Sequence, residues 1–374
     1  MSALVLILAL AVRTLRLQAP QGDKQTKTNL EQRQRTQRAV ALLYQALIAD
    51  KQVSYTAISD TTVSYGGRQI NSKARVIHAP RRLALEYIGG DAQGVAAGFN
   101  ERWFWRKADL KDPAEPRKVY AEVQEETEEM AAKRFALILD NYSAAWEKSE
   151  DVAGRPADVI LLRPFQPVAG AQGPGKRLWI DSETHLTVGV ETLNHQMQPV
   201  MRSMLTEVRV QLATADKSST SSLAQSPLMS VSLPKDESWV AEDMGDNRLA
   251  VEKTTGVQPP QPRILPPGFQ LESVGVHRCR LPGKSESQAA ALSRYTDGMN
   301  TLTIFAMKPQ KEASGSRTEE TCNFGLSTLV MRDTERGRMI AMADLPKPIL
   351  QSIVDSAHIK WASDGSETAS PEQK

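Results

Sequence analysis

Residue types that commonly carry out chemistry occur in this chain, but their spacing does not assemble a catalytic motif. The histidines form neither an HExxH motif nor a pair at i, i+4, the spacing that places two metal ligands on one face of a helix. No G-x-S-x-G nucleophile elbow occurs either. We therefore expect no metal site and no catalytic residues. The five scattered histidines are His78, His185, His195, His277 and His358.

One stretch has the spacing of a phosphate-binding loop. Gly170, Gly175 and Lys176 match the Walker A pattern, but Arg177 stands where a Ser or Thr would hold Mg²⁺. The acidic residues between Glu125 and Glu129 are better explained as the solvated face of a helix than as paired carboxylates. The chain is therefore predicted not to be an enzyme and not to need a cofactor.

The chain contains two cysteines, Cys279 and Cys322, too few for a multi-cysteine zinc site. Both fall on strands predicted for one small domain near the C-terminus. If the protein is exported to an oxidising compartment, a disulfide between them is expected. Two buried free thiols are the alternative.

Length and charge limit the remaining classes of protein. A chain of 374 residues is too long for one ordinary domain, so we expect two or three. Its 46 basic and 44 acidic residues give a formal charge of +2, and no basic block is interleaved with aromatic residues. Binding to nucleic acid is therefore not expected.

The N-terminus carries a short apolar run, Ala3 to Val12. Ten residues are too few to span a bilayer but match the apolar part of a signal peptide, and Leu17-Gln18-Ala19 loosely resembles a cleavage site. Against a signal peptide, no Lys or Arg precedes the run, and Arg13 and Arg16 follow it. We expect residues 1–27 to be a signal or anchor for export. A misassigned start or a buried N-terminal segment remains open.

Hydrophobic periodicity predicts an α+β first half. Apolar residues at helical spacing predict a helix over 30–50, and an acidic start favours a second helix over 122–139. Residues 53–120 read as strands, with a hairpin at Tyr65-Gly66-Gly67-Arg68. Alternating residues then predict an antiparallel meander over 151–210, with a turn at Asp181-Ser182-Glu183-Thr184.

The second half is divided by a change in composition. Residues 213–263 are rich in Ser and Pro and are predicted to be a linker. A compact module follows over 264–358, with hairpins at Asp297-Gly298 and at 333–337. A final helix opens at Pro346 with an apolar stripe, a polar tail covers 359–374, and the chain from Ser363 is predicted to be disordered. The stripe consists of Ile349, Leu350, Ile353 and Val354.

The order of these segments resembles the MucB/RseB family of sigma-factor regulatory proteins. In the first half the resemblance rests on Val152-Ala153-Gly154-Arg155, Leu178-Trp179-Ile180-Asp181 and Thr184. In the second it rests on Leu265-Pro266-Pro267-Gly268-Phe269, Tyr295-Thr296-Asp297-Gly298 and Ala343-Asp344-Leu345-Pro346. It covers about residues 28–212 and 264–358. The N-terminal run without leading basic residues and the long linker depart from the pattern.

The resemblance implies a LolA-like antiparallel half-barrel over 28–212, covered by helices, linked to a small antiparallel sheet-plus-helix domain. Proteins similar to LolA use the concave face as an apolar pocket for acyl chains, and a half-barrel cannot fill its interior as densely as a sandwich. Each aromatic residue of the first half alone is most simply a core residue. Together they are predicted to line or border a lipid-binding cavity between the sheet and the two helices. The residues predicted for that cavity are Tyr55, Tyr65, Leu85, Tyr87, Trp103, Trp105, Trp146 and Trp179.

For function, the resemblance implies a non-enzymatic regulator of envelope stress in the periplasm. Such a protein would bind the extracytoplasmic domain of an anti-sigma factor and sense a lipid or lipidated ligand, with possible membrane association. The alternative is a periplasmic carrier of lipids or lipoproteins. The second module separates the two expectations, because simple LolA-type carriers lack such a domain.

Overall fold

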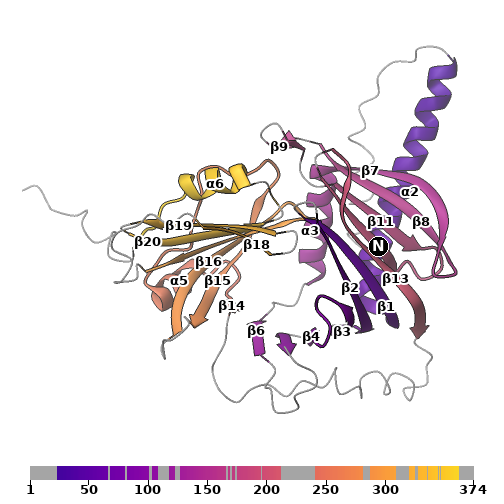
Figure 1. Ribbon diagram of the computed structural model, residues 1–374. Helices are drawn as coiled ribbons and strands as arrows, with labels where there is room; N and C mark the ends of the chain where they lie inside the picture. The colour runs from indigo at the N-terminus through magenta and orange to yellow at the C-terminus, as the bar shows by residue number, and fades with distance from the viewer. Residues whose placement is uncertain are drawn as a thin grey trace, which may run out of the picture.

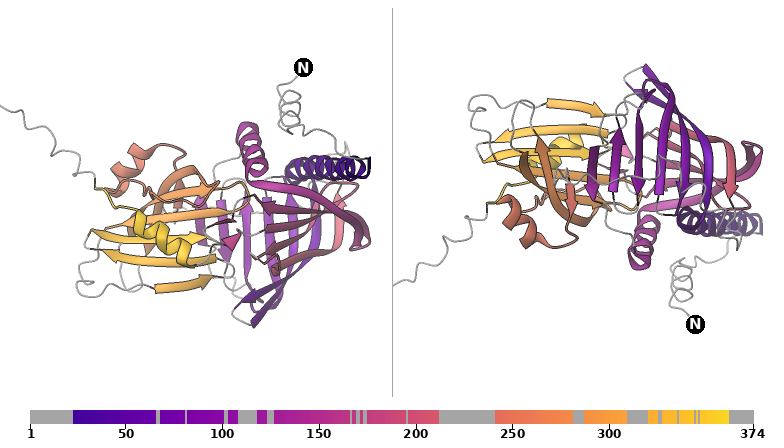
Figure 2. Two further views of the ribbon diagram at one scale, coloured as in Figure 1. Left: turned by 90° about the horizontal axis from the view of Figure 1, so that it is seen from above. Right: turned by 90° about the horizontal axis from the view of Figure 1, so that it is seen from below.

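The computed structural model contains two antiparallel sheets with few helices (Figure 1). It describes residues 23–361 apart from 66–67, 81, 101–102, 108–117, 123–126, 166, 169–170, 173–174, 195, 212–240, 281–286, 309–319, 325–326, 335, 344 and 346. Figure 2 shows that the second sheet lies beside the first rather than stacked on it, with helix α3 between them. Residues 1–22 of the predicted N-terminal signal or anchor, the Ser-rich part of the linker and residues 362–374 of the predicted polar tail lie outside the described residues. The predicted start of that tail is wrong, because Ile359 is buried in the core of the second sheet.

Within the described chain, the first sheet has eleven strands in the order β6-β5-β4-β3-β2-β1-β13-β12-β11-β8-β7. Strand β1 pairs with β2 down to Tyr65 and Arg68, which confirms the predicted hairpin. The strands of the first half are β1 (Ser54–Tyr65), β2 (Arg68–Ala79), β3 (Arg82–Gly90), β4 (Ala96–Asn100), β5 (Trp103–Lys107) and β6 (Lys118–Glu122).

The predicted meander is present as neighbouring antiparallel strands of the same sheet. It turns at Asp181, whose Oδ1 accepts hydrogen bonds from the backbone N and the hydroxyl of Thr184, both at 2.7 Å. Its strands are β7 (Tyr142–Val152), β8 (Arg155–Pro164), β11 (Gly175–Asp181), β12 (Thr187–Leu193) and β13 (Pro199–Gln211). The short strands β9 (Pro167–Val168) and β10 (Ala171–Gln172) form a separate pair.

Two helices pack on the meander. Helix α2 (Asp23–Gln52) reaches the core only from Ala39 onward, because the side chains described before it are mostly polar and exposed, and Leu30 is 56% exposed. Helix α3 (Glu128–Asn141) begins six residues later than predicted. The residue before it, Thr127, is its N-cap, because the Thr127 hydroxyl accepts a hydrogen bond from the backbone N of Met130 at 3.2 Å. The cap explains the late start, since it satisfies a backbone donor that the first turn leaves unpaired.

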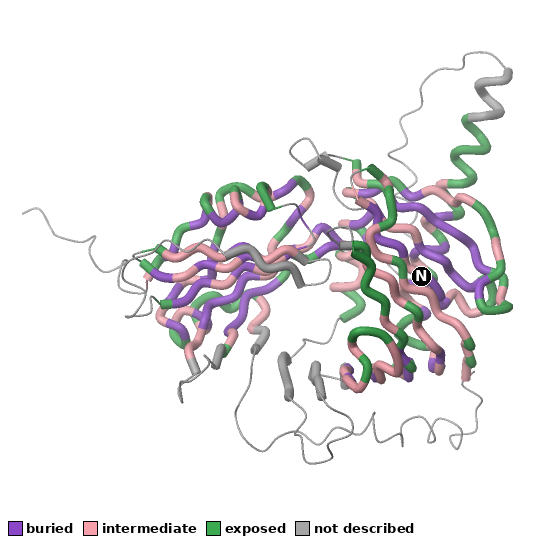
Figure 3. The backbone as a smooth tube through the Cα atoms, viewed as in Figure 1, coloured by how far each residue is buried: buried purple, intermediate pink, exposed green. Residues whose placement is uncertain are grey.

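Strands β8 and β11, near one end of the first sheet, are buried on both faces. Figure 3 shows buried stretches, in purple, along strands of both sheets. On β8, the neighbouring residues Val159 and Ile160 point to opposite faces, yet both are fully buried. The face beneath α2 and α3 forms what we call the helix-side core, which includes Leu43, Ile138, Ile160, Leu162 and Ile180. A second cluster, called here the aromatic-side core, includes Tyr55, Val76, Val159, Trp179 and Leu186.

The second sheet is built from the C-terminal module. Within the described chain its strand order is β14-β15-β16-β17-β20-β19-β18, and the hairpins predicted at Asp297-Gly298 and at 333–337 are confirmed by the pairing of β16 with β17 and of β19 with β20. Its strands are β14 (Ala241–Asp243), β15 (Gln270–Arg280), β16 (Ser287–Thr296), β17 (Thr301–Met307), β18 (Glu320–Phe324), β19 (Ser327–Thr334) and β20 (Gly337–Ala343).

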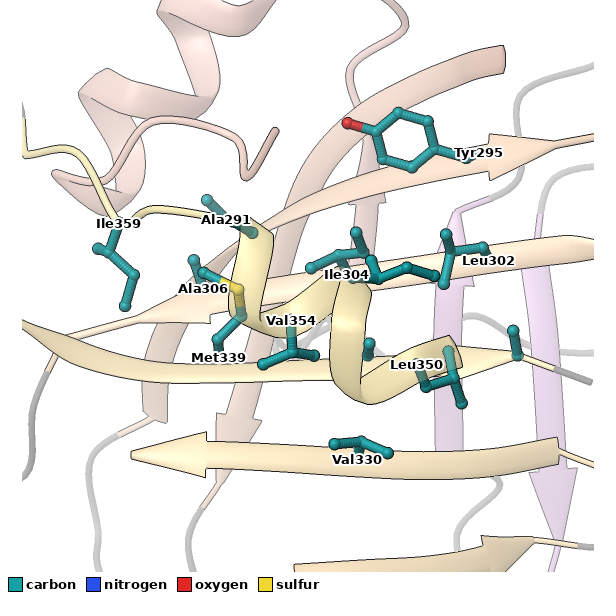
Figure 4. Packing of buried hydrophobic residues seen from close by; sticks show 14 of the residues in the cluster. Ala291, Tyr295, Leu302, Ile304, Ala306, Val330, Met339, Leu350, Val354 and Ile359 are labelled. Atoms are coloured by element: carbon teal, nitrogen blue, oxygen red, sulfur yellow. The ribbon is translucent and has the colours of Figure 1, made fainter. Parts of the chain in front are cut away.

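Helix α6 (Lys347–Ser356) covers one face of this sheet (Figure 4). Three residues of its predicted stripe, Leu350, Ile353 and Val354, are almost fully buried against Ile304 and Val330. Strand β20 alternates buried and half-buried residues, as expected for a strand with one buried face. The second sheet therefore follows its sequence pattern closely.

The predicted linker is shorter than expected. Strand β14 pairs with β15, and helix α5 (Arg248–Thr255) places Val251 in the core of the second sheet, which also contains Val257. The Pro-rich stretch after α5 is bound to the second sheet, since the backbone oxygen of Pro260 accepts a hydrogen bond from the hydroxyl of Tyr295 on β16 at 3.1 Å. Residues from 241 onward therefore belong to the second module.

Among the described helices, none combines the length and the apolar character that crossing a membrane requires.

Candidate functional site

The structure does not bring the eight predicted cavity residues together. Trp146 on β7 pairs with Ile160 and packs in the helix-side core. Trp179 on β11 pairs with Val159 and belongs to the aromatic-side core. Because neighbouring residues of β8 point to opposite faces, the two tryptophans lie on opposite faces of the sheet. The prediction that one cavity is lined by both is therefore wrong.

Trp146 belongs to a charged cluster beneath helix α2. Its indole Nε1 donates to Asp158 Oδ1 at 2.9 Å, and that same oxygen accepts from Ser149 Oγ and from Arg38, each at 2.6 Å. The Arg38 guanidinium also lies over the Trp146 ring, 4.5 Å from its centroid. Burial opposes the charge on Asp158, but the three hydrogen bonds outweigh it and lower the pKa of this carboxyl. The cluster fixes α2 on the sheet.

Trp179 is only 4% exposed and is held by polar partners at its edge. Its Nε1 donates to Glu150, and Arg202 lies over its ring at 5.5 Å. A Cβ at Gly189 would come within 3.0 Å of the ring and 2.7 Å of Met204, so this glycine is needed for the close packing. This geometry describes a packed tryptophan rather than a free cavity wall.

Tyr55 on β1 lies with Trp179 in the aromatic-side core, and the half-buried Leu85 on β3 packs against that core. Tyr55 stacks on His78 with ring centroids 4.8 Å apart, and burial raises the pKa of its hydroxyl far above the ordinary value. Tyr87 is half-buried on β3. Tyr65, Trp103 and Trp105 are placed on β1 and β5 by their backbones, and their side chains lie outside what the structure describes.

Half-buried apolar side chains border the aromatic-side core. We call this set the apolar border; it is the part of the first domain where apolar surface is available without separating a helix from the sheet. It consists of Val53, Leu83, Leu85, Met204, Leu205, Val208 and Val210. By contrast, Leu43, Ile160 and Leu162 in the helix-side core are at most 2% exposed, so a ligand there would have to displace α2 or α3.

The sheet topology argues against the predicted disulfide. Cys279 lies on β15 and Cys322 on β18, as predicted, in the same sheet. Four strands, β16, β17, β20 and β19, separate those two strands. At about 4.8 Å per step, five steps separate the backbones by roughly 24 Å. A disulfide needs Cα atoms within about 7 Å, so the alternative of two free thiols fits the fold.

The contact between the two modules is a buried polar site. Asp297, at the tip of the β16–β17 hairpin, accepts a hydrogen bond from the Tyr142 hydroxyl at 2.6 Å. Asn300 Nδ2 donates to the same hydroxyl at 2.6 Å and to Asp297 Oδ2 at 3.0 Å. These three side chains are 3–6% exposed. Burial and the Asp297 charge raise the pKa of Tyr142, so its hydroxyl remains a donor.

A second turn of the C-terminal module reaches the same place. Asn141 Nδ2 donates to the backbone oxygen of Gly268 at 3.1 Å and to that of Asp297 at 3.0 Å. Gly298 and Gly268 both have positive φ, +95° and +85°, and both approach the first module closely. We call this set the interdomain junction; its members are Asn141, Tyr142, Gly268, Asp297, Gly298 and Asn300.

Sequence reasoning did not identify the junction. Asp297-Gly298 is predicted to be a hairpin turn and Gly268 lies in a motif that carries the family resemblance, but nothing in either local pattern indicates what these residues contact. Across the part of the chain that the structure describes, no group of three or more His, Cys, Asp or Glu side chains could hold a metal ion. The polar clusters above make hydrogen bonds and ion pairs that join elements of the fold, although Asn300 Oδ1 is buried without a hydrogen-bond partner.

Comparisons with known proteins agree with this architecture. Residues 114–226 match the family model of the MucB/RseB N-terminal domain. The structure is similar to that of MucB in the Pseudomonas aeruginosa MucA/MucB complex, with a TM-score of 0.58 and 17% identity, covering 87% of this chain and 99% of that one. It is also similar to MucB in complex with MucA(peri), with a TM-score of 0.57 and 18% identity, covering 87% of this chain and 100% of that one.

MucB solved by itself gives a TM-score of 0.53 at 16% identity, over 86% of this chain and 98% of that one. No curated protein sequence matches the chain. At these identities the structural likeness establishes the fold, and the sequence match identifies the N-terminal domain. Over 86–87% of its length the chain therefore has the fold of MucB, and residues 114–226 are similar to the MucB/RseB N-terminal domain.

Proposed function

We propose that this protein is a non-enzymatic regulator that binds the extracytoplasmic part of an anti-sigma factor. The observation that carries the proposal is the likeness to MucB over both modules, since two of the similar structures are complexes of MucB with MucA. A likeness confined to the first sheet would fit a carrier equally well. The presence of the second module therefore favours a regulator whose binding partner contacts both modules over a carrier.

The chemistry of the described residues supports action through surfaces. Buried charged groups such as Asp158, Asp181 and Asp297 are each engaged by several donors. Groups held this way stabilise a fold and are poorly placed to transfer protons to a substrate. Binding, rather than catalysis, is the activity that this arrangement favours.

The proposal also covers where the protein acts and which kind of ligand it senses. The regulator would act on the extracytoplasmic side of the membrane, where the corresponding part of an anti-sigma factor lies. It would sense a lipid or an acylated ligand through the first domain. The apolar border around Leu83, Leu85 and Met204 supports this idea, because it offers partly exposed apolar surface beside a buried aromatic core.

Titration of the intact chain against the extracytoplasmic segment of a candidate anti-sigma factor tests the regulator. We expect saturable binding of the segment, and weaker binding when a fatty-acyl probe is present, because linkage makes two opposing ligands weaken each other reciprocally. Absence of segment binding by the folded intact chain would reject the regulator.

The ligand is tested separately with the acyl probe and tryptophan fluorescence. Leu85→Asp should weaken probe binding, whereas Ile70→Asp, at an exposed position on β2 (38% exposed), serves as the control. Probe binding without segment binding would favour the carrier of lipids or lipoproteins. Equal binding by both variants would place the ligand elsewhere.

A further inference from the structure

We propose that the interdomain junction is a latch that holds the two sheets in one orientation. The expectation from the sequence alone is two domains on a flexible linker. In the structure, however, residues distant in the chain form a buried hydrogen-bonded contact between the modules, with Tyr142 and Asp297 separated by 155 positions. Two modules joined by such a contact move together for as long as it is intact.

The geometry of the hairpin tip suits this role. Asp297 Oδ1 accepts from the backbone N of Met299 at 2.9 Å and of Asn300 at 2.6 Å, so its own hairpin orients the carboxylate. Its other oxygen, Oδ2, is then directed at Tyr142. Because the carboxylate is aligned before it meets the first module, docking loses little side-chain entropy.

Shape complementarity adds to the polar contact. A Cβ on Gly298 would lie 2.7 Å from Ile138 Cγ1, 2.9 Å from the Ile138 backbone N and 3.1 Å from the Arg134 backbone oxygen. Met299, the next residue of the tip, packs against the helix-side core. The tip therefore fits directly against the last turns of α3, a space that any side chain at position 298 would fill.

The residues of the first domain that the hairpin tip contacts are part of that domain's core or adjoin it. Ile138 is 1% exposed and packs in the helix-side core, while Asn141 and Tyr142 lie where α3 ends and β7 begins. Helix α3 is in turn packed on α2 through an edge contact of Phe135 with Tyr44, with ring centroids 5.3 Å apart. The orientation of the second sheet is thus set by the position of α3.

Two pairs of variants test the latch, each matched to a control within the second module. Tyr142→Phe removes a buried hydroxyl across the junction, and Tyr295→Phe removes one that bonds to Pro260 inside the second module. Gly298→Ala adds a Cβ against α3. Gly256→Ala adds one at a similar positive φ, +70°, where only the end of the Lys308 side chain lies near.

The measurement is the distance distribution between spin labels at Asp151→Cys and Lys347→Cys, in the full chain with Cys279 and Cys322 replaced by Ser. Both label positions are exposed, one in each module. We expect a single narrow distribution for the parent and for Tyr295→Phe and Gly256→Ala, and a broader one for Tyr142→Phe and Gly298→Ala. An unchanged distribution in both folded junction variants would overturn the latch. Tyr142→Phe, which adds no atoms, keeps the test valid if Gly298→Ala fails to fold.

A second arm rests on the proposed function. If the partner needs both sheets in their latched orientation, a latch that is closed only one tenth of the time lowers the apparent affinity about tenfold. If the junction variants show broader distance distributions but bind the anti-sigma segment as tightly as the parent, the latch still holds the two sheets together but has no role in binding. Absence of segment binding by the parent would instead reject the proposed function without affecting the distance result.

Discussion

The two sheets bury their cores by different means. Around β8 and β11 the first sheet is covered on both faces and includes buried carboxylates, Asp158 and Asp181, each neutralised by an arginine. In the second sheet α6 covers one face with apolar side chains, and the buried residues of β17 and β20 are apolar or glycine. The first sheet should therefore respond to loss of charge partners and to acid, whereas the second should respond to loss of apolar volume.

The largest effect is expected from a cavity in the second core. Leu350→Ala removes a fully buried side chain from α6, facing Ile304 and Val330. Substitutions of this kind cost about 3 kcal/mol of the free energy of unfolding. Denaturant unfolding, followed by hydrogen exchange in the second sheet, measures the loss. Leu249→Ala on α5, at a side chain that is 79% exposed, is the control and should change little. A loss confined to the first sheet would contradict the comparison.

A smaller loss is expected when a buried charge partner is removed from the first sheet. Asp181 is fully buried and accepts from Arg155 Nε at 2.7 Å and from its terminal nitrogen at 3.0 Å. Asp181→Asn should cost about 2 kcal/mol, because it weakens charge-assisted hydrogen bonds inside the protein. Glu183→Gln is the matched control: Glu183 contacts the same arginine but is 74% exposed, so the exposed pair contributes little. Equal losses in the two variants would show that burial is not the deciding factor.

Acid should destabilise the first sheet before the second. Burial raises the pKa values of Asp158 and Asp181, but hydrogen bonds and arginine partners outweigh burial and lower both below their ordinary values. A carboxyl whose pKa is lower in the folded state contributes stability above its unfolded pKa of about 3.9, and this stability is lost as the pH falls below that value. Hydrogen exchange between pH 5 and 2, compared sheet by sheet, measures the order of loss. Earlier loss of protection in β16, β17 and β20 would contradict the expectation.

The smallest expected effect is that of reductant. Because Cys279 and Cys322 lie on strands five steps apart in the sheet, no bridge should be broken by reduction. The melting temperature should be the same with and without dithiothreitol, and two thiols per chain should react under denaturing, non-reducing conditions. Fewer than two reactive thiols would show that the strand order around β18 differs from the one described.

Turns and one-faced strands were predicted accurately from sequence because their signals are local. Asp297-Gly298 predicts a tight reversal, since glycine accepts the positive φ that the turn requires. Strand β20 shows its single buried face as an alternation. The start of α3 was missed because the cap at Thr127 lies behind a run of acidic residues that also favour a helix.

Strands buried on both faces do not show an alternation of apolar and polar residues, so the sequence does not indicate which side chains share a face. Val159, Ile160, Leu161 and Leu162 are all buried, so their pattern does not say which of them faces the helices. The sequence therefore indicated that Trp146 and Trp179 are buried in the first domain but not that the sheet separates them. For the same reason it determined that a sheet with two helices forms, and left open where a ligand could enter.

The sequence by itself indicated most of the strands and turns, the two helices of the first half, the final helix and a resemblance to the MucB/RseB family, because each of these signals depends on residues near one another in the chain. The tertiary structure alone decided which strands are neighbours, and with them the separation of the two cysteines. It also decided that Asp297 meets Tyr142, since a contact across 155 positions depends on how both modules fold. Gly268 and Asp297 lie in two of the motifs that carry the resemblance of the C-terminal module, and both accept hydrogen bonds from Asn141 of the first domain.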